Sequence, residues 1–130
     1  MRGNSKALAH GEYKLTFTDN VFCIIAKGAW NVEAIQSVHQ DIIKILAGKN
    51  INAFSVCIEV SEFELGTPEF QSFGTDSLKS LARLGLKKIA YVNESRSAVS
   101  NTQIAKLNSE SSKYEWGLFK SVAEARKWLA

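Results

Sequence analysis

A buried strand that is joined to an amphipathic helix by a short acidic segment constrains the fold of this chain most. Residues 54–58 (Phe-Ser-Val-Cys-Ile) are apolar and β-branched enough for the interior of a sheet. In residues 59–64 acids alternate with apolar residues, which indicates that the strand leaves the core there. Gly66 then turns the chain, Thr67 is a helix cap, and Pro68 suits the first helical position. The sequence predicts that the functional surface lies at this turn.

The remaining elements follow from periodicity and turn chemistry. Strands are predicted over residues 13–18, 21–26, 88–92 and 114–119, with Asp19-Asn20 as a two-residue hairpin turn and Gly28 as the end of the second strand. Helices are predicted from the cap Asn31 to Gly48, after Thr67, over residues 97–107, and from Ser121, which opens a capping box with Glu124.

The order ββαβαβαβα defines the fold class. Strands that are separated by single helices need crossover connections, so the last four strands should be parallel and the first antiparallel to its hairpin partner. The prediction is an α/β domain with a mixed, mostly parallel five-stranded sheet and four main helices. A chain of 130 residues with 45% apolar content buries one ordinary core. We expect a mobile tail over residues 1–11 and a single domain over residues 12–130.

Charge and cysteine content narrow the class of protein. The net charge of +3 does not by itself indicate a nucleic-acid partner. Five acids and no Lys or Arg lie between Asn50 and Leu78, so the surface should be polarised. Cys23 and Cys57 lie in apolar runs and are expected to behave as small hydrophobes. The start of the chain lacks a secretory signal and no stretch approaches a membrane span, so we expect a cytoplasmic protein, which is either soluble or peripheral to a membrane.

The chain resembles the STAS domains, and within them the small SpoIIAA-like proteins related to anti-sigma factor antagonists. The resemblance covers residues 12–130. It rests on the order of elements, the passage Cys57-Ile-Glu-Val-Ser61, the helix after the next turn, and the ending Phe119-Lys-Ser-Val-Ala-Glu-Ala-Arg-Lys-Trp-Leu129.

The resemblance implies a non-enzymatic module that binds a protein partner. In the sporulation members of the family, phosphorylation of a serine at the start of the second helix breaks that contact. Here Thr67 falls on or beside the aspartate that precedes the serine, and Pro68, which has no hydroxyl, falls at the serine position. We therefore expect Thr67 to be a helix cap rather than a regulated phosphosite.

Two functions from different classes remain open. The first, which the resemblance favours, is a regulatory module that binds a basic protein partner or a second copy through the acidic turn and the exposed side of the second helix. The second is a carrier of an apolar, lipid-like ligand that associates with a membrane surface through the second helix. The residues proposed for the first are Glu62, Glu64, Thr67 and Glu69, and those for the second are Phe63, Leu65, Phe70, Phe73, Lys79 and Arg83.

Residue types argue against a catalytic or metal site. The two histidines are His10, in the expected tail, and His39, which we predict as a surface or boundary residue of the first helix. No calcium-loop, metal-ligand or phosphate-loop spacing is present, so no cofactor and no metal are predicted. Gly74 lies within the second helix, where glycine costs about 1 kcal/mol relative to Ala, which suggests a hinge. The alternative, which remains open, is that Phe70 and Phe73 beside it are simply core residues.

Overall fold

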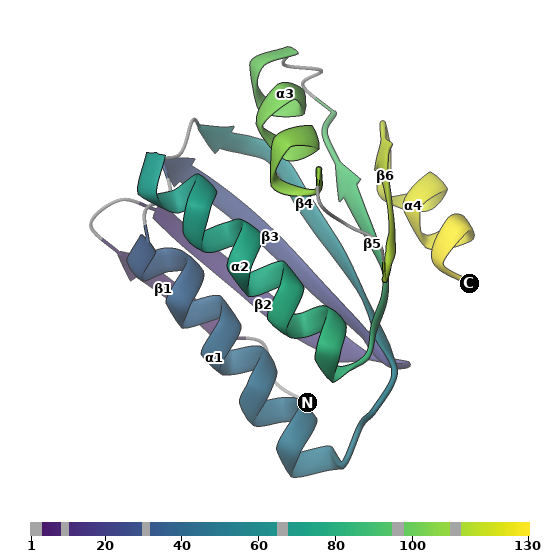
Figure 1. Ribbon diagram of the computed structural model, residues 1–130. Helices are drawn as coiled ribbons and strands as arrows, with labels where there is room; N and C mark the ends of the chain where they lie inside the picture. Colours follow the sequence, from purple (N-terminus) through teal and green to yellow (C-terminus); the bar gives the residue numbers. More distant parts are fainter. Residues whose placement is uncertain (1–3, 9–10, 30–31, 65–67, 95–97, 110–112) are drawn as a thin grey trace.

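The structure is a computed structural model that describes residues 4–8, 11–29, 32–64, 68–94, 98–109 and 113–130. Within them a six-stranded sheet is combined with four helices (Figure 1). The strands are β1 (Asn4–Leu8), β2 (Gly11–Thr18), β3 (Val21–Ala29), β4 (Phe54–Glu64), β5 (Leu86–Val92) and β6 (Glu115–Phe119). The helices are α1 (Val32–Lys49), α2 (Pro68–Leu84), α3 (Ala98–Leu107) and α4 (Val122–Leu129). The predicted fold class and element order are confirmed from β2 onward.

The strands lie in the sheet in chain order, from β1 to β6. β2 is antiparallel to β3, and β3 to β6 are parallel, as predicted. Every crossover from β3 onward steps in the same direction, so right-handed connections place α1, α2 and α3 on one face of the sheet. No strand follows β6, so α4 is not part of a crossover connection. It packs on the opposite face of the sheet against β4, β5 and β6.

Side-chain alternation along the central strands divides the interior into two cores. Val56, Ile89 and Tyr91 point to the face of α1, α2 and α3 and join the larger core. Their neighbours Cys57 and Ala90 point to the other face and pack with Ala125 of α4. Because both faces of β4 and β5 are covered, these strands are apolar throughout their middle, as parallel central strands usually are.

Two details of the strands correct the sequence prediction. Asn4–Leu8, expected within a mobile tail, forms β1 and pairs with β2 through the backbone, which requires no apolar alternation. β4 does not end near Ile58 but continues to Glu64, because β3 also continues past Gly28 and pairs with it. A register shift between Ile25 and Lys27 and the positive φ of Gly28 (80°) accommodate this extension.

Local signals at the hairpin and at α4 act as predicted. Asp19 and Asn20 both have positive φ (53° and 62°), the conformation of a tight two-residue hairpin turn. Ser121 caps α4 by accepting a hydrogen bond of 3.2 Å from the Glu124 N–H. α2 begins at Pro68, as its fixed φ favours. Asn31 and Thr67, the other predicted caps, lie outside the described residues.

Buried tyrosine hydroxyls connect the elements around the larger core. The Tyr13 hydroxyl of β2 donates to Asp41 of α1 at 2.6 Å. Asn108, which follows α3, donates to the Tyr91 hydroxyl of β5 and accepts from Tyr114, which precedes β6. Burial raises the pKa of Tyr13 and Tyr91 well above the ordinary range, and raises the pKa of Tyr114 to about 12.

These tyrosines predict a loss of stability in alkali. The chain has three tyrosines, and the pKa of each is raised in the folded state above the ordinary value of 10. Above pH 10 the unfolded chain releases tyrosine protons that the folded chain retains. The free energy of unfolding, which these tyrosines do not lower below pH 10, therefore falls by about 1.4 kcal/mol per pH unit for each tyrosine that is still protonated in the folded state. We expect the tyrosinate absorbance at about 295 nm to rise together with the loss of circular dichroism, through pH 12. Tyrosine ionisation near pH 10 in a still folded protein would contradict this expectation.

Candidate functional site: an apolar cavity beneath α2

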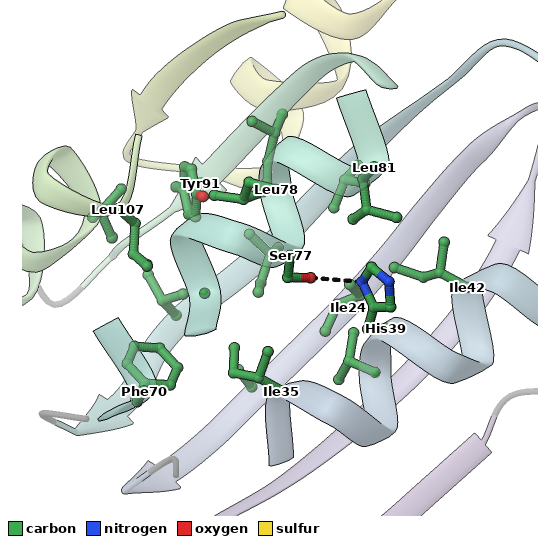
Figure 2. Close-up of a pocket in the computed structure, with 18 of the residues that line it drawn as sticks. Ile24, Ile35, His39, Ile42, Phe70, Ser77, Leu78, Leu81, Tyr91 and Leu107 are labelled. Carbon is green, nitrogen blue, oxygen red and sulfur yellow. Dashed lines mark hydrogen bonds between the residues drawn. The ribbon is translucent and has the colours of Figure 1, made fainter. Parts of the chain in front are cut away.

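An apolar cavity lies between the sheet and the three helices that cover it (Figure 2). Its volume is about 100 Å³. α2 contributes Phe70, Gly74, Ser77, Leu78 and Leu81, a spacing that places one side of the helix against the cavity. The remaining lining comes from β3 (Ile24, Ala26), α1 (Ile35, Val38, His39, Ile42), β4 (Val56, Ile58, Val60), β5 (Ile89, Tyr91) and α3 (Gln103, Ile104, Leu107).

The wall of the cavity consists almost entirely of carbon, although four lining residues carry polar side chains. His39 Nδ1 and Ser77 Oγ share a hydrogen bond of 2.7 Å, which Figure 2 shows between α1 and α2. The Tyr91 hydroxyl accepts from Asn108 outside the cavity at 2.9 Å. Polar groups that are satisfied in this way offer nothing to a polar ligand, and burying such a ligand without partners costs free energy. The cavity therefore suits an apolar group.

The His39–Ser77 contact is structural rather than nucleophilic. Burial lowers the pKa of His39, so the ring is neutral near pH 7 and a serine beside it resembles half of a nucleophilic pair. Acyl transfer also needs donors for the developing oxyanion, and the backbone N–H groups around Ser77 already bond within α2. His39 was predicted as a surface or boundary residue of α1. It is half-buried, in agreement with that prediction, and joins α1 to α2.

α2 approaches α3 closely at Gly74, which also lines the cavity. A Cβ atom added to Gly74 would lie 2.6 Å from Leu107 Cδ2, a distance that requires the leucine to move. Thr75, the next residue, donates to the Gln71 and Leu107 carbonyls at 3.1 and 3.5 Å, and the Gln71 side chain donates to the Gln103 carbonyl at 3.3 Å. Gly74 lies within the continuous helix α2. The glycine therefore allows close packing against Leu107. The hinge that the sequence suggested stays a prediction.

The structure distributes the predicted site residues over different environments. Phe70 is buried and lines the cavity, as the ligand hypothesis requires. Phe73 is half-buried and does not line it. Glu69, Lys79 and Arg83 are exposed on the outer side of α2. Glu62, Phe63 and Glu64 lie in β4 without described side chains, and Leu65 and Thr67 lie outside the described residues.

Sequence reasoning missed most of the cavity wall. Ser77, His39 and Leu107 carry no motif and come from three helices whose mutual placement depends on the fold. The spacing of Phe70, Gly74 and Ser77 along α2 was the available signal, because it marks one side of a helix that is interrupted by small residues.

The cysteines lie away from the cavity, on the face of α4. Cys23 and Cys57 are partners in the register of β3 and β4, and Arg126 of α4 lies 3.6 Å from Cys23 Sγ. Burial raises the pKa of Cys57 to about 11, which keeps its thiol protonated and unreactive near pH 7. The described residues contain no group of three or more metal-ligating side chains. Within the same residues, no helix is both long and apolar enough to cross a membrane.

Comparison with solved structures identifies proteins that have a similar fold. The chain is similar to a protein of the DUF3478 family with a SpoIIAA-like fold from Shewanella loihica PV-4, at 15% identity, a TM-score of 0.71 and coverage of 98% of this chain and 100% of the other. It is also similar to an anti-sigma factor antagonist from Mycobacterium paratuberculosis, at 12% identity, a TM-score of 0.59 and coverage of 95% and 97%. The chain has a SpoIIAA-like fold. A search of protein-family models found no match, and neither did a sequence comparison with curated proteins.

The close approach of α2 and α3 in this SpoIIAA-like fold gives a prediction for glycine substitutions. Gly48→Ala in α1 meets no neighbour within 4 Å and should stabilise the protein by about 0.5–1 kcal/mol through helix propensity. Gly74→Ala makes the same change but displaces Leu107, so it should be less stabilising than Gly48→Ala by about 1 kcal/mol. Urea unfolding measures both.

A double-mutant cycle provides the control for this prediction. In a Leu107→Ala background the obstructing Cδ2 atom is absent, so Gly74→Ala should regain the full propensity gain. Equal effects of Gly74→Ala in the two backgrounds would show that Leu107 does not restrict this position.

Proposed function

We propose that the chain is a non-enzymatic binding module in which α2 covers a site for an apolar ligand. The observation that supports this function is the cavity, which lies between α1, α2, α3 and the sheet and presents a carbon wall. An unfilled cavity of 100 Å³ costs about 2 kcal/mol of stability. That is a large fraction of the roughly 5–15 kcal/mol that stabilises a typical domain, so a fold selected for stability alone would fill the space.

The volume also limits what the site accepts without rearrangement. Dry apolar cavities of about 150 Å³ bind benzene or xenon, and the cavity here is somewhat smaller at 100 Å³. A small ring or a short branched chain fits this space, whereas a long acyl chain requires α2 to move away from the sheet. Lys79 and Arg83 are exposed on the C-terminal half of α2 and would face an anionic membrane from which such a ligand is taken up.

Filling the cavity should abolish binding without unfolding the protein. Ala26 of β3 is buried in the wall, and Ala26→Leu places three further carbon atoms in the space. We expect benzene, and decanoic acid if α2 moves, to shift the methyl NMR signals of Ile24, Ile42 and Ile104 saturably in the unmodified protein. Ala26→Leu should weaken this binding at least about tenfold, which corresponds to 1.4 kcal/mol.

Two further variants keep the test of the cavity specific. Ala105→Leu adds the same atoms on an exposed position of α3 and should leave binding unchanged. Ala26→Val is the smaller change if the leucine overpacks the core. Absence of saturable shifts with both probes, or equal affinity in Ala26→Leu, would exclude the cavity as a ligand site.

A second candidate function is regulation through a protein partner at the β4–α2 turn and the outer side of α2. The acids Glu62, Glu64 and Glu69 support it, because they belong to a stretch without Lys or Arg, and Glu69 is exposed. The name of one structural neighbour, an anti-sigma factor antagonist, describes a protein that acts on another protein. An acidic surface of this kind fits a basic partner.

Charge reversal tests the partner function. Affinity capture with the unmodified chain should retain a partner that the triple variant Glu62→Lys, Glu64→Lys, Glu69→Lys loses. Asp76→Lys, further along the exposed side of α2, changes one charge away from the turn and should retain it. A partner that the triple variant still retains does not bind through this surface.

A further inference from the structure

The two edges of the sheet differ in their protection against pairing. In the part of the chain that the structure describes, β1 and β6 are the outermost strands. An edge strand exposes backbone N–H and C=O groups that can pair with another strand, and natural edges are commonly protected by Lys, Pro or polar residues. β1 (Asn-Ser-Lys-Ala-Leu) is polar and carries Lys6. β6 (Glu-Trp-Gly-Leu-Phe) is apolar after its first residue and has neither Lys nor Pro.

The backbone of β6 shows which of its groups face outward. The Phe119 carbonyl accepts a hydrogen bond of 3.0 Å from the Asn93 N–H, which follows β5, so this carbonyl points toward β5. Because carbonyls alternate along a strand, the N–H and C=O groups of Trp116 and Leu118 point away from β5. The Leu118 side chain is 40% exposed at the same edge, and Leu84 is the other large apolar side chain with comparable exposure among the described residues.

We propose that β6 pairs with β6 of a second copy of this chain, antiparallel about a twofold axis at Gly117. In this register Glu115 lies opposite Phe119 of the second copy, Trp116 opposite Leu118, and Gly117 opposite itself. The outward-facing residues Trp116 and Leu118 then exchange backbone hydrogen bonds, as the directly opposed pairs of an antiparallel ladder do. Both side chains lie on the face of the apolar cavity, beside their β5 partners Ile89 and Tyr91, so the exposed Leu118 packs against Trp116 twice in the dimer.

The charges along β6 and its flanks agree with a second copy of the chain as the partner. This register pairs all five residues of β6, and a shift by two residues in either direction shortens the ladder. A shift by one residue would set outward-facing groups opposite inward-facing ones. Beyond the strand, Lys120 of one copy lies opposite Tyr114 of the other, and Lys113 opposite Ser121, so no like charges are opposed.

Sedimentation velocity of the full chain tests the dimer independently of the ligand cavity. The unmodified protein should shift reversibly from monomer to dimer between about 5 µM and about 1 mM, because an interface of one short strand is weak. Leu118→Lys should raise the dissociation constant at least about tenfold. Leu84→Lys, which introduces the same charge at an equally exposed leucine on α2, should leave it unchanged. Circular dichroism confirms that each variant remains folded.

Hydrogen exchange then locates the interface. The amides of Trp116 and Leu118 should exchange more slowly as the concentration rises in the unmodified protein, and not in Leu118→Lys. A protein that remains monomeric to 1 mM overturns the proposal. A dimer that still forms in Leu118→Lys also overturns the proposal. So does a dimer in which the amides that exchange more slowly at high concentration lie outside residues 115–119.

Discussion

The parallel pairing of β3 with β4 is the constraint on which the rest of the structure depends. Both strands are long, with Val21–Ala29 paired to Phe54–Glu64 across a single register shift. This pairing fixes the floor of the cavity, since Ile24, Val56 and Ile58 project from these two strands toward the helices. It also determines where α1 ends and where α2 begins, because α1 connects the two strands and α2 starts shortly after β4. A parallel pair cannot form without such a crossover, so α1, one of the three helices that cover the cavity, arises from the same pairing.

The position of α2 follows from contacts on its two sides. His39 and Ser77 join it to α1, and the absence of a side chain at Gly74 lets it approach Leu107 of α3. All four residues also line the cavity, so these contacts form part of its wall. Together with the hydrogen bonds from Gln71 and Thr75 to carbonyls of α3, they hold α2 against its neighbouring helices over the cavity.

Sequence signals predicted the elements that depend on a few neighbouring residues. The turn Asp19-Asn20, the first helical position of Pro68 and the cap Ser121 act locally, and each was read correctly. The limits of β4 and the existence of β1 depend on a partner strand elsewhere in the chain. The local pattern therefore predicted a strand over residues 54–58 only, whereas β4 continues to Glu64. Phe70 was found because helical spacing marks it. The cavity residues of α1 and α3 were not predicted from the sequence, because no local pattern indicates which helices lie together over a sheet.

The proposed β6 pairing would join the two candidate functions in one geometry. A twofold axis through Gly117 that runs perpendicular to the sheet keeps the same face of both copies on the same side. Both cavities and both α2 helices would then lie on one side of a continuous sheet, and α4 of each copy would lie on the other. Two weak sites that face the same surface bind it with a higher effective concentration than either alone. A membrane or a repetitive protein partner would meet both α2 helices together, so even a weak dimer would increase binding at α2 without altering the cavity itself.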